Sequence, residues 1–350
     1  MRDGLLRRAE HLFFLICTSV FFCYSIFAKL TNATGNSSLV GGGLSVELTG
    51  GVTAVYQIPS NTKQEPLSGI LLVAHGCSHS ATDWWQKSSS CPLCIGLPVE
   101  CAIVRKALEN NMAVIALSSS NRKHKCWINR IDEVHAVTAI KFMYEQVKTP
   151  IGMRTPPLFL LGASSGGAFV GTFSHDARTF GLVVSAICVQ IMFRRIHREK
   201  PVGHGINISI KDFSEGYILS NETMIPTLFV HMPQDVRTKR LIGNDIKVMN
   251  EHTPNSAIEL LCLKKNMTSS YFFDHNAVLS LNDSDIFIKA LNKAGYLSIK
   301  NTLINDPRRS AWREVSMIFI FIFRPCNFPF LNSLIFDYFP LLCILHPCHF

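Results

Sequence analysis

The stretch that most constrains this chain is LFLLGASSGGAFVG, residues 158–171, in which an apolar run enters a turn with a glycine on each side of a serine. An apolar run followed at once by Gly162-x-Ser164-x-Gly166 and further small residues predicts a buried strand, a sharp turn and the start of a helix. Such a turn strains the backbone of the serine, so the residues two before and two after it must be small. Both are glycine, which favours a catalytic serine over a glycine-rich turn that only packs closely.

Apolar runs and amphipathic stretches alternate along the chain on both sides of this serine turn. Continuous apolar runs, such as GILLVA at 69–74, are typical of strands covered on both faces of a sheet. Apolar residues three and four apart, as in 131–147, predict amphipathic helices. The alternation predicts an α/β chain with a mostly parallel central sheet, helices on both faces and an active site at the carboxyl ends of the strands. We expect strands at 52–58, 69–74, 113–117, 158–161, 181–191, 225–230 and 258–263, and helices at 99–110, 131–147 and 284–294.

The composition excludes several broad classes of protein. With 350 residues, 47% of them hydrophobic and 17% charged, the chain can bury a sizeable core and is not a disordered tail. The formal net charge is +9, but lysine and arginine occur in short scattered groups, without a zinc finger, an aromatic RNA-binding motif or a basic helix. We therefore expect no nucleic-acid partner, and no motif implies a cofactor.

The first thirty residues are typical of a targeting segment. Three arginines within the first eight residues precede an uncharged run of 17 residues at 12–28. This length lies between the core of a signal peptide and a membrane-spanning helix, and the bulky Ile26, two residues before Ala28, weakens the cleavage site that ends at Ala28. Residues 1–30 are therefore predicted to be a signal peptide or a signal anchor. In both cases the basic flank places the rest of the chain in the secretory lumen, either secreted or anchored to the membrane.

Residues 31–50, which begin TNATGNSSLVGGG, are predicted to be a polar linker. Asn-x-Ser/Thr patterns there and further along the chain indicate a lumenal glycoprotein, with chance occurrence as the alternative. The six predicted acceptors are Asn32, Asn36, Asn207, Asn221, Asn266 and Asn282.

Cysteines are frequent, with 12 in the chain. In an oxidising lumen, the group formed by Cys91, Cys94, Cys101 and Cys126 predicts one or two disulfides. A zinc site built on Cys91-Pro92-Leu93-Cys94 is the alternative, although zinc prefers a second close pair of Cys or His residues.

The layout around Ser164 resembles that of the α/β-hydrolase family, in which the serine is followed along the chain by an acid and then by a histidine. The resemblance implies that Asp235, five residues past an apolar strand, is the acid, and that His275, after the last strand, is the base. His231 and His252 fall outside this order. A turn aspartate at Asp235 and a simple polar loop around His275 are the alternatives.

His75-Gly76-Cys77 directly follows the strand predicted at 69–74 and resembles the His-Gly turn of the same family. The resemblance implies that the backbone N–H groups of Cys77 and Ser165 form the oxyanion hole. His75 is expected to hold the turn by hydrogen bonds rather than to act as a base.

The block HGCSHSATDWW at 75–85, followed by CPLCIGLP at 91–98, resembles an uncharacterised group of plant-type α/β hydrolases. This resemblance extends over about residues 50–314, and we predict one α/β-hydrolase domain at 51–314. It implies no particular substrate. The two adjacent tryptophans of the block either line an acyl or sugar pocket or cover the sheet.

Residues 315–350 differ in character from the domain before them. They are almost all apolar, rich in Phe, Cys and Pro, and have no period, and their prolines argue against a clean spanning helix. Val315-Ser316-Met317 is compatible with codons that open like an intron donor. We therefore hypothesise that the tail is read-through sequence and that the native C-terminal segment, with or without the catalytic histidine, is missing.

Taken together, the sequence predicts a serine hydrolase of the secretory lumen that cleaves an ester or related acyl bond through an acyl-enzyme on Ser164. Its expected partner is a small-molecule or lipid-like acyl substrate. A non-catalytic glycoprotein that keeps the fold as a binding or scaffold module is the alternative. Metal-dependent hydrolysis through the Cys and His residues is a third hypothesis.

Overall fold

The described residues of the computed structural model form two compact units by their contacts. Unit 1 runs to His231 and resumes at Arg237–Leu260, and unit 2 takes Val236 and the chain from Leu261 onward. The domain predicted at 51–314 thus spans both units. The structure describes residues 42–60, 66–147, 155–176, 182, 184–190, 225–231, 236–261, 266–275 and 279–304.

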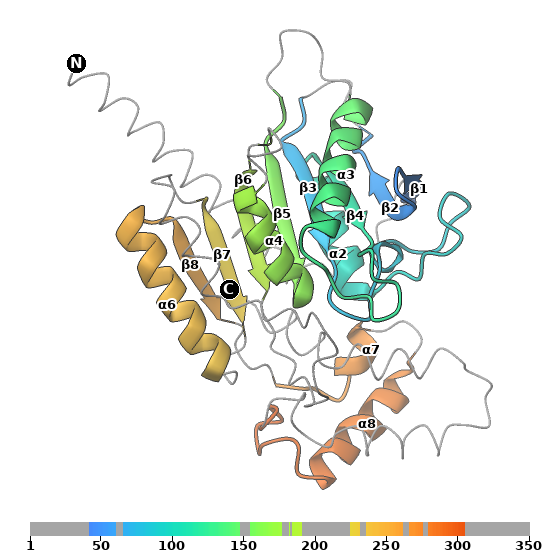
Figure 1. Ribbon diagram of the computed structural model, residues 1–350. Coiled ribbons are helices and arrows are strands. Elements are labelled where there is room, and N and C mark those ends of the chain that lie inside the picture. Colours follow the sequence, from blue (N-terminus) through green and yellow to red (C-terminus); the bar gives the residue numbers. More distant parts are fainter. Residues whose placement is uncertain are drawn as a thin grey trace. The chain divides into compact units, whose positions relative to one another are not determined.

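The described part of unit 1 is built around an eight-stranded sheet in the order β1-β2-β4-β3-β5-β6-β7-β8 (Figure 1). β3 pairs in parallel with β4 and β5, β5 with β6, and β6 with β7, whereas β2 runs antiparallel to β1 and β4. Because β4, β3 and β5 are parallel neighbours, the turns that follow them meet at one edge of the sheet. The strands are β1 (Leu44–Leu48), β2 (Val52–Gln57), β3 (Gly69–Ala74), β4 (Met112–Leu117), β5 (Leu158–Ala163), β6 (Val184–Gln190), β7 (Thr227–His231) and β8 (Ala257–Leu261).

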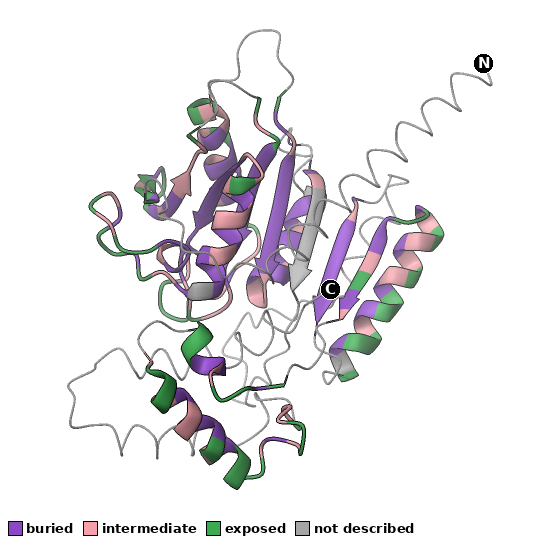
Figure 2. Cartoon of the chain, turned by 180° about the vertical axis from the view of Figure 1, so that it is seen from behind, coloured by how far each residue is buried: buried purple, intermediate pink, exposed green. Residues whose placement is uncertain are grey.

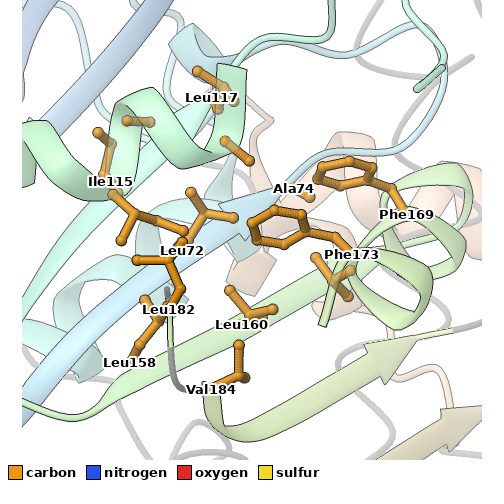
Figure 3. Packing of buried hydrophobic residues seen from close by; sticks show 14 of the residues in the cluster. Leu72, Ala74, Ile115, Leu117, Leu158, Leu160, Phe169, Phe173, Leu182 and Val184 are labelled. Atoms are coloured by element: carbon orange, nitrogen blue, oxygen red, sulfur yellow. The ribbon is translucent and has the colours of Figure 1, made fainter. Parts of the chain in front are cut away.

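Helices cover both faces of this sheet. Every residue of β3 and β4 is buried, as Figure 2 shows in purple. Alternate strand residues such as Leu72 and Leu160 join one apolar cluster with α3, α4 and α6, in which Phe169 and Phe173 come from α4 (Figure 3). The side chains between them point to the opposite face, where α2, whose buried residues lie outside that cluster, packs against β4. The helices are α2 (Pro98–Glu109), α3 (Ile131–Val147), α4 (Ser165–Asp176) and α6 (Val236–His252), with a short 3-10 turn, η2, at Ala81–Asp83.

The described part of unit 2 contains α7 (Tyr271–His275) and α8 (Leu281–Lys293) around a small apolar cluster of its own. The hydroxyl of Ser280 accepts the N–H of Asp283 at 3.1 Å, and the Asp283 carboxylate accepts the N–H of Ser280 at 3.0 Å. This reciprocal cap fixes the start of α8 by satisfying donors that a helix start leaves open. Phe272 and Phe287 meet edge to face in the cluster, with ring centroids 4.6 Å apart.

The predicted fold class is confirmed: the chain has a mostly parallel central sheet with helices on both faces. Each predicted strand and helix is present, with ends within three residues of those expected. Further elements lie where the sequence predicts none, among them the short η2 and α7. β1 falls inside the predicted linker at 31–50 and pairs with β2 along its whole length, and α6 separates β7 from β8.

Several predictions concern residues outside the described part of the chain, namely the leader at 1–30, the tail at 315–350 and four of the six glycosylation acceptors. The other two acceptors, Asn266 and Asn282, are exposed. Among the residues that are described, no helix combines the length and the apolar character that crossing a bilayer requires.

Candidate active site

Ser164 lies between the end of β5 and the start of α4, in the turn that the sequence predicts. Its φ of 54° is in the left-handed region, which a residue with a side chain adopts at a cost of about 1–3 kcal/mol. Backbone strain of this kind persists only where the surrounding structure enforces it, and it gathers at functional sites. The strain predicted for this serine is therefore present.

The two glycines that flank Ser164 have no room for a side chain. A Cβ on Gly162 would meet the backbone carbonyl of Gly166, and a Cβ on Gly166 would meet the carbonyl oxygens of Ala74 and His75. The serine turn therefore packs backbone to backbone against the end of β3. This contact is the physical reason for the G-x-S-x-G spacing.

The start of α4 places beside the serine N–H groups that have no acceptor within the helix. The Ser164 carbonyl accepts the N–H of Ala168 at 3.1 Å, which is the first hydrogen bond of the helix. The N–H groups of the preceding residues, beginning with Ser165, consequently have no acceptor within the helix. The positive end of the helix dipole lies at the same place. Both features suit a site at which negative charge develops, as expected for the Ser165 N–H.

The turn after β3 lies directly against the serine turn. A Cβ placed on Gly76 would be 3.5 Å from the Cβ of Ser164 and 3.7 Å from the carbonyl oxygen of Ala163. This proximity follows from the sheet, because Ala74 and Gly162 are paired neighbours at the ends of β3 and β5. The structure thus brings Ser164 together with the two turns that carry the N–H groups predicted for the oxyanion hole.

His75 holds the turn after β3 and is unsuited to act as a base. Its Nδ1–H donates to the Gly76 carbonyl at 2.6 Å, and its Nε2 accepts the N–H of Ser119 at 3.0 Å. Burial lowers the pKa of His75 to about 3, so the ring is neutral at physiological pH. Both ring nitrogens are occupied by backbone groups, in agreement with the structural role predicted for this residue.

The disulfides differ from the predicted grouping. Cys91 bonds to Cys94 as the prediction allows, but Cys126 bonds to Cys77, a residue outside the predicted group. Cys101 is a buried free thiol, and burial, followed by the neighbouring Glu100, raises its pKa to about 12. The predicted grouping was therefore wrong for Cys101 and Cys126. Cys126 bonds to Cys77 because these two residues come from the segments that follow two adjacent strands, β3 and β4.

The disulfide between Cys91 and Cys94 also bears on the zinc alternative. Zinc binds thiolates, and both sulfur atoms of this Cys-x-x-Cys motif are bonded to each other. Within the described ranges, no group of three or more His, Cys, Asp or Glu side chains is arranged to hold a metal ion.

A second histidine, His79, belongs to the turn after β3, and it was not predicted as a site residue. His79 donates from Nδ1 to the Asp83 carboxylate at 2.8 Å, and its Cδ2 lies 3.8 Å from the Cβ position of Gly76. Asp83 is 4% exposed and also accepts the N–H of Ser80 at 3.2 Å, which caps η2. The i, i+4 spacing in HSATD was the signal for this pair, although the same spacing is common in helix caps.

The buried carboxyl of Glu100 lies near His79 and Asp83, whose charges affect its pKa. Burial raises the pKa of Glu100 to about 7, an effect that the charge of His79 partly opposes. The polar groups behind the turn after β3 therefore include one neutral imidazole and one carboxyl that titrates near neutrality.

The tryptophans next to this turn are packed rather than exposed. Trp84 and Trp85 are 2% and 4% exposed, and the indole N–H of Trp85 donates to Gln57 of β2 at 2.9 Å. Of the two predicted roles, covering the sheet fits Trp85 better.

The predicted acid and base are not placed by the described part of the chain. Asp235 lies outside the described residues, and His275 is the last residue of α7 in unit 2, with its side chain undescribed. His231, at the end of β7, is buried and paired with Glu259 of β8 at 2.5 Å. His252 ends α6. The assignments of Asp235 and His275 therefore stay predictions.

Comparisons with known proteins give distant structural likenesses. No family model and no curated protein matches the chain. Esterase Est22 is 12% identical with a TM-score of 0.46, over 68% of this chain and 75% of that one. An arylesterase is 11% identical with a TM-score of 0.42, over 75% and 88%, and Est1E from Butyrivibrio proteoclasticus is 13% identical with a TM-score of 0.40, over 72% and 100%.

The class of fold rests on the chain's own features. Its strand order, its parallel pairing and its strained serine turn between β5 and α4 together define an α/β-hydrolase fold.

Proposed function

We propose that this protein is a serine hydrolase that cleaves an ester or related acyl bond through an acyl-enzyme on Ser164. The observation that carries the proposal is the backbone of the serine turn. Ser164 is held at a φ of 54° at the start of a helix, with the turn of Gly76 and Cys77 against it. A serine that is merely structural needs neither the strain nor the second turn.

In the proposed reaction the Ser164 hydroxyl attacks the substrate carbonyl and passes its proton to a histidine, for which His275 is the candidate. The N–H groups of Cys77 and Ser165 stabilise the oxyanion, each contributing about 3 kcal/mol in the transition state. Asp235 orients the histidine and stabilises its charged form. The histidine then gives the proton to the leaving alcohol. Water next attacks the acyl-enzyme and passes a proton to the histidine, which gives it to the Ser164 oxygen as the acid leaves.

The proposed substrate is a small-molecule or lipid-like acyl compound. We also propose that the protein works in the secretory lumen as a glycoprotein, secreted or held by its leader. The basic flank, the apolar run at 12–28 and the six acceptor patterns support this location.

Labelling of the purified chain with a fluorophosphonate tests the proposal, because such probes react with activated serines. The natural chain and Ser165→Ala should be labelled, since the variant keeps its backbone N–H, whereas Ser164→Ala should not. Asp235→Asn and His275→Ala should lose most of the labelling. Equal labelling of Ser164→Ala would contradict the proposal.

An unlabelled natural chain has two explanations. Under the read-through hypothesis, the product of the spliced transcript would be labelled on Ser164. If that product is also unlabelled, the protein is a non-catalytic member of the fold.

A further inference from the structure

The peptide bond that joins Gly76 to Cys77 carries the N–H proposed as an oxyanion donor. No peptide bond among the described residues is cis, so the Gly76 carbonyl and the Cys77 N–H point in opposite directions. The carbonyl is held by the Nδ1–H of His75 at 2.6 Å. This hydrogen bond fixes the plane of the peptide and thereby directs the Cys77 N–H away from His75.

Two further links join the same turn to residues 118–127, which follow β4 and which we call the clamp segment. The side chain of Cys77 is bonded to Cys126, and the N–H of Ser78 donates to the carbonyl of His124 at 3.3 Å. Ser78 itself has a φ of 72°, a strained conformation for a residue with a side chain. Cys77 and the residue that follows it are therefore both attached to one segment.

The clamp segment is itself firmly attached to the core. The indole N–H of Trp127 donates to the His75 carbonyl at 2.7 Å, and the ring stacks on Phe169 of α4 with centroids 4.3 Å apart. The N–H of Ser119 donates to Nε2 of His75. Because α4 begins at the serine turn, Trp127 links the clamp segment to the same helix that positions Ser164. The disulfide thus joins the turn after β3 to a support that is already fixed relative to the nucleophile.

We propose that the Cys77–Cys126 disulfide positions the Cys77 N–H as an oxyanion donor, so that opening this bond slows acyl transfer while substrate binding is largely kept. The proposal rests on the proposed function. Cys126 is a positioning residue, since it acts through Cys77 and touches no reacting atom. The disulfide between Cys91 and Cys94 lies in another turn of unit 1 and provides a matched control.

The first experiment compares kinetics with p-nitrophenyl acetate for Cys126→Ala, Cys77→Ala, their double variant and the Cys91→Ala/Cys94→Ala control, each below its own Tm. Removing a whole oxyanion donor lowers kcat by about 100- to 1,000-fold, so displacing one should lower it by about 10- to 100-fold, with KM changed by less than about 3-fold. The two single variants and the double variant should lose the same factor, because each opens the same bond. The control should stay within about 2-fold of the natural chain.

A second experiment opens the disulfide of the natural protein by reduction with dithiothreitol and then measures esterase activity. Reduction transfers two electrons and two protons to the disulfide, giving the thiols of Cys77 and Cys126, and the reductant closes to its cyclic disulfide. The natural chain and the Cys91→Ala/Cys94→Ala control should lose activity. Cys126→Ala should not respond further, because its bond is already open.

Hydrogen exchange of the peptide containing residues 75–79 gives a readout that does not depend on activity. Exchange in this peptide should rise in Cys126→Ala and stay unchanged in the Cys91→Ala/Cys94→Ala control. A Tm that falls in Cys126→Ala with kcat and exchange unchanged below that Tm would overturn the proposal and leave a purely structural disulfide. If neither the natural chain nor the product of the spliced transcript hydrolyses the ester or labels on Ser164, the proposed function fails, and the exchange result still decides whether the disulfide positions the turn.

Discussion

The two turns that meet at Ser164 are held in place by different means. The serine turn is fixed locally, by two glycines that let backbones touch and by the start of α4. The turn after β3 is fixed from a distance, by hydrogen bonds and a disulfide to the clamp segment. A locally fixed turn leaves a short pattern in the sequence, whereas a turn fixed from a distance does not. The two turns should also fail in different ways when they are mutated.

At neutral pH the largest effect is expected from Gly166→Ala, which breaks the locally fixed turn. The new Cβ would meet the carbonyl oxygens of Ala74 and His75, which are backbone atoms that cannot rotate away. We expect the free energy of unfolding to fall by about 3 kcal/mol, and labelling of Ser164 to be lost. Urea unfolding and fluorophosphonate labelling measure the two effects.

Gly243→Ala is the matched control for this substitution. A Cβ on Gly243 would meet nothing within 4 Å, and the residue lies inside α6. Alanine is the better helix former, so this variant should gain about 0.5–1 kcal/mol and keep its labelling. Equal destabilisation by both substitutions would mean that the serine turn has more room than its contacts indicate.

The next effect is a pH dependence that comes from His75, on the turn fixed from a distance. Burial lowers the pKa of His75 from 6.5 to about 3, so between these values the unfolded chain binds the proton and the folded chain does not. The stability that this residue contributes is complete above pH 6.5 and decreases by about 1.4 kcal/mol for each pH unit as the pH falls toward 3. His75→Gln should remove that slope, as urea unfolding at pH 4, 5 and 6 would show. Parallel pH curves for the variant and the natural chain would contradict a buried neutral His75.

A smaller effect of opposite sign is expected from Glu100. Burial raises its pKa from 4.5 to about 7, so the folded chain holds the proton between these values. The stability that the protonated Glu100 contributes is complete below pH 4.5 and is lost as the pH rises through 7. Glu100→Gln should stabilise the protein by about 1–2 kcal/mol at pH 8 and have little effect at pH 4. Thermal unfolding at the two pH values tests this, and a loss of stability at pH 8 would point to a partner that needs the charge.

The contrast between local and distant support also explains which helices and strands could be predicted from the sequence. The helix at 131–147 was predicted with its observed bounds because apolar residues recur along it at three- and four-residue steps. α6 was missed because its sequence is mostly polar, although Ile242, Ile246 and Met249 recur along it at four- and three-residue steps and pack into the core. β1 was missed because most of its residues are exposed and because it is defined by its pairing with β2 rather than by its own composition.

The residues of the candidate site likewise fall into those that a short stretch of sequence identifies and those that only the fold brings together. Ser164 and its glycines could be identified from fourteen letters, since the strained serine and the glycines that permit the close contacts all belong to that segment. The bond between Cys77 and Cys126 could not be identified by spacing, because it depends on β3 and β4 being neighbours in the sheet. The same holds for His79 and Asp83, whose importance comes from lying beside Gly76. The roles of Asp235 and His275 rest on the family order alone.

The disulfide between Cys77 and Cys126 has a consequence for how the protein matures. It closes a ring across a sequence separation of 49 residues, which includes η2, α2 and β4. Closing a ring of this size removes about 4 kcal/mol of chain entropy from the unfolded state. If the turn of Cys77 needs this bond, a newly made chain can be folded and yet incompetent until it meets an oxidant. Oxidation would then be the last step of biosynthesis, and the compartment where it occurs would decide where the protein becomes active.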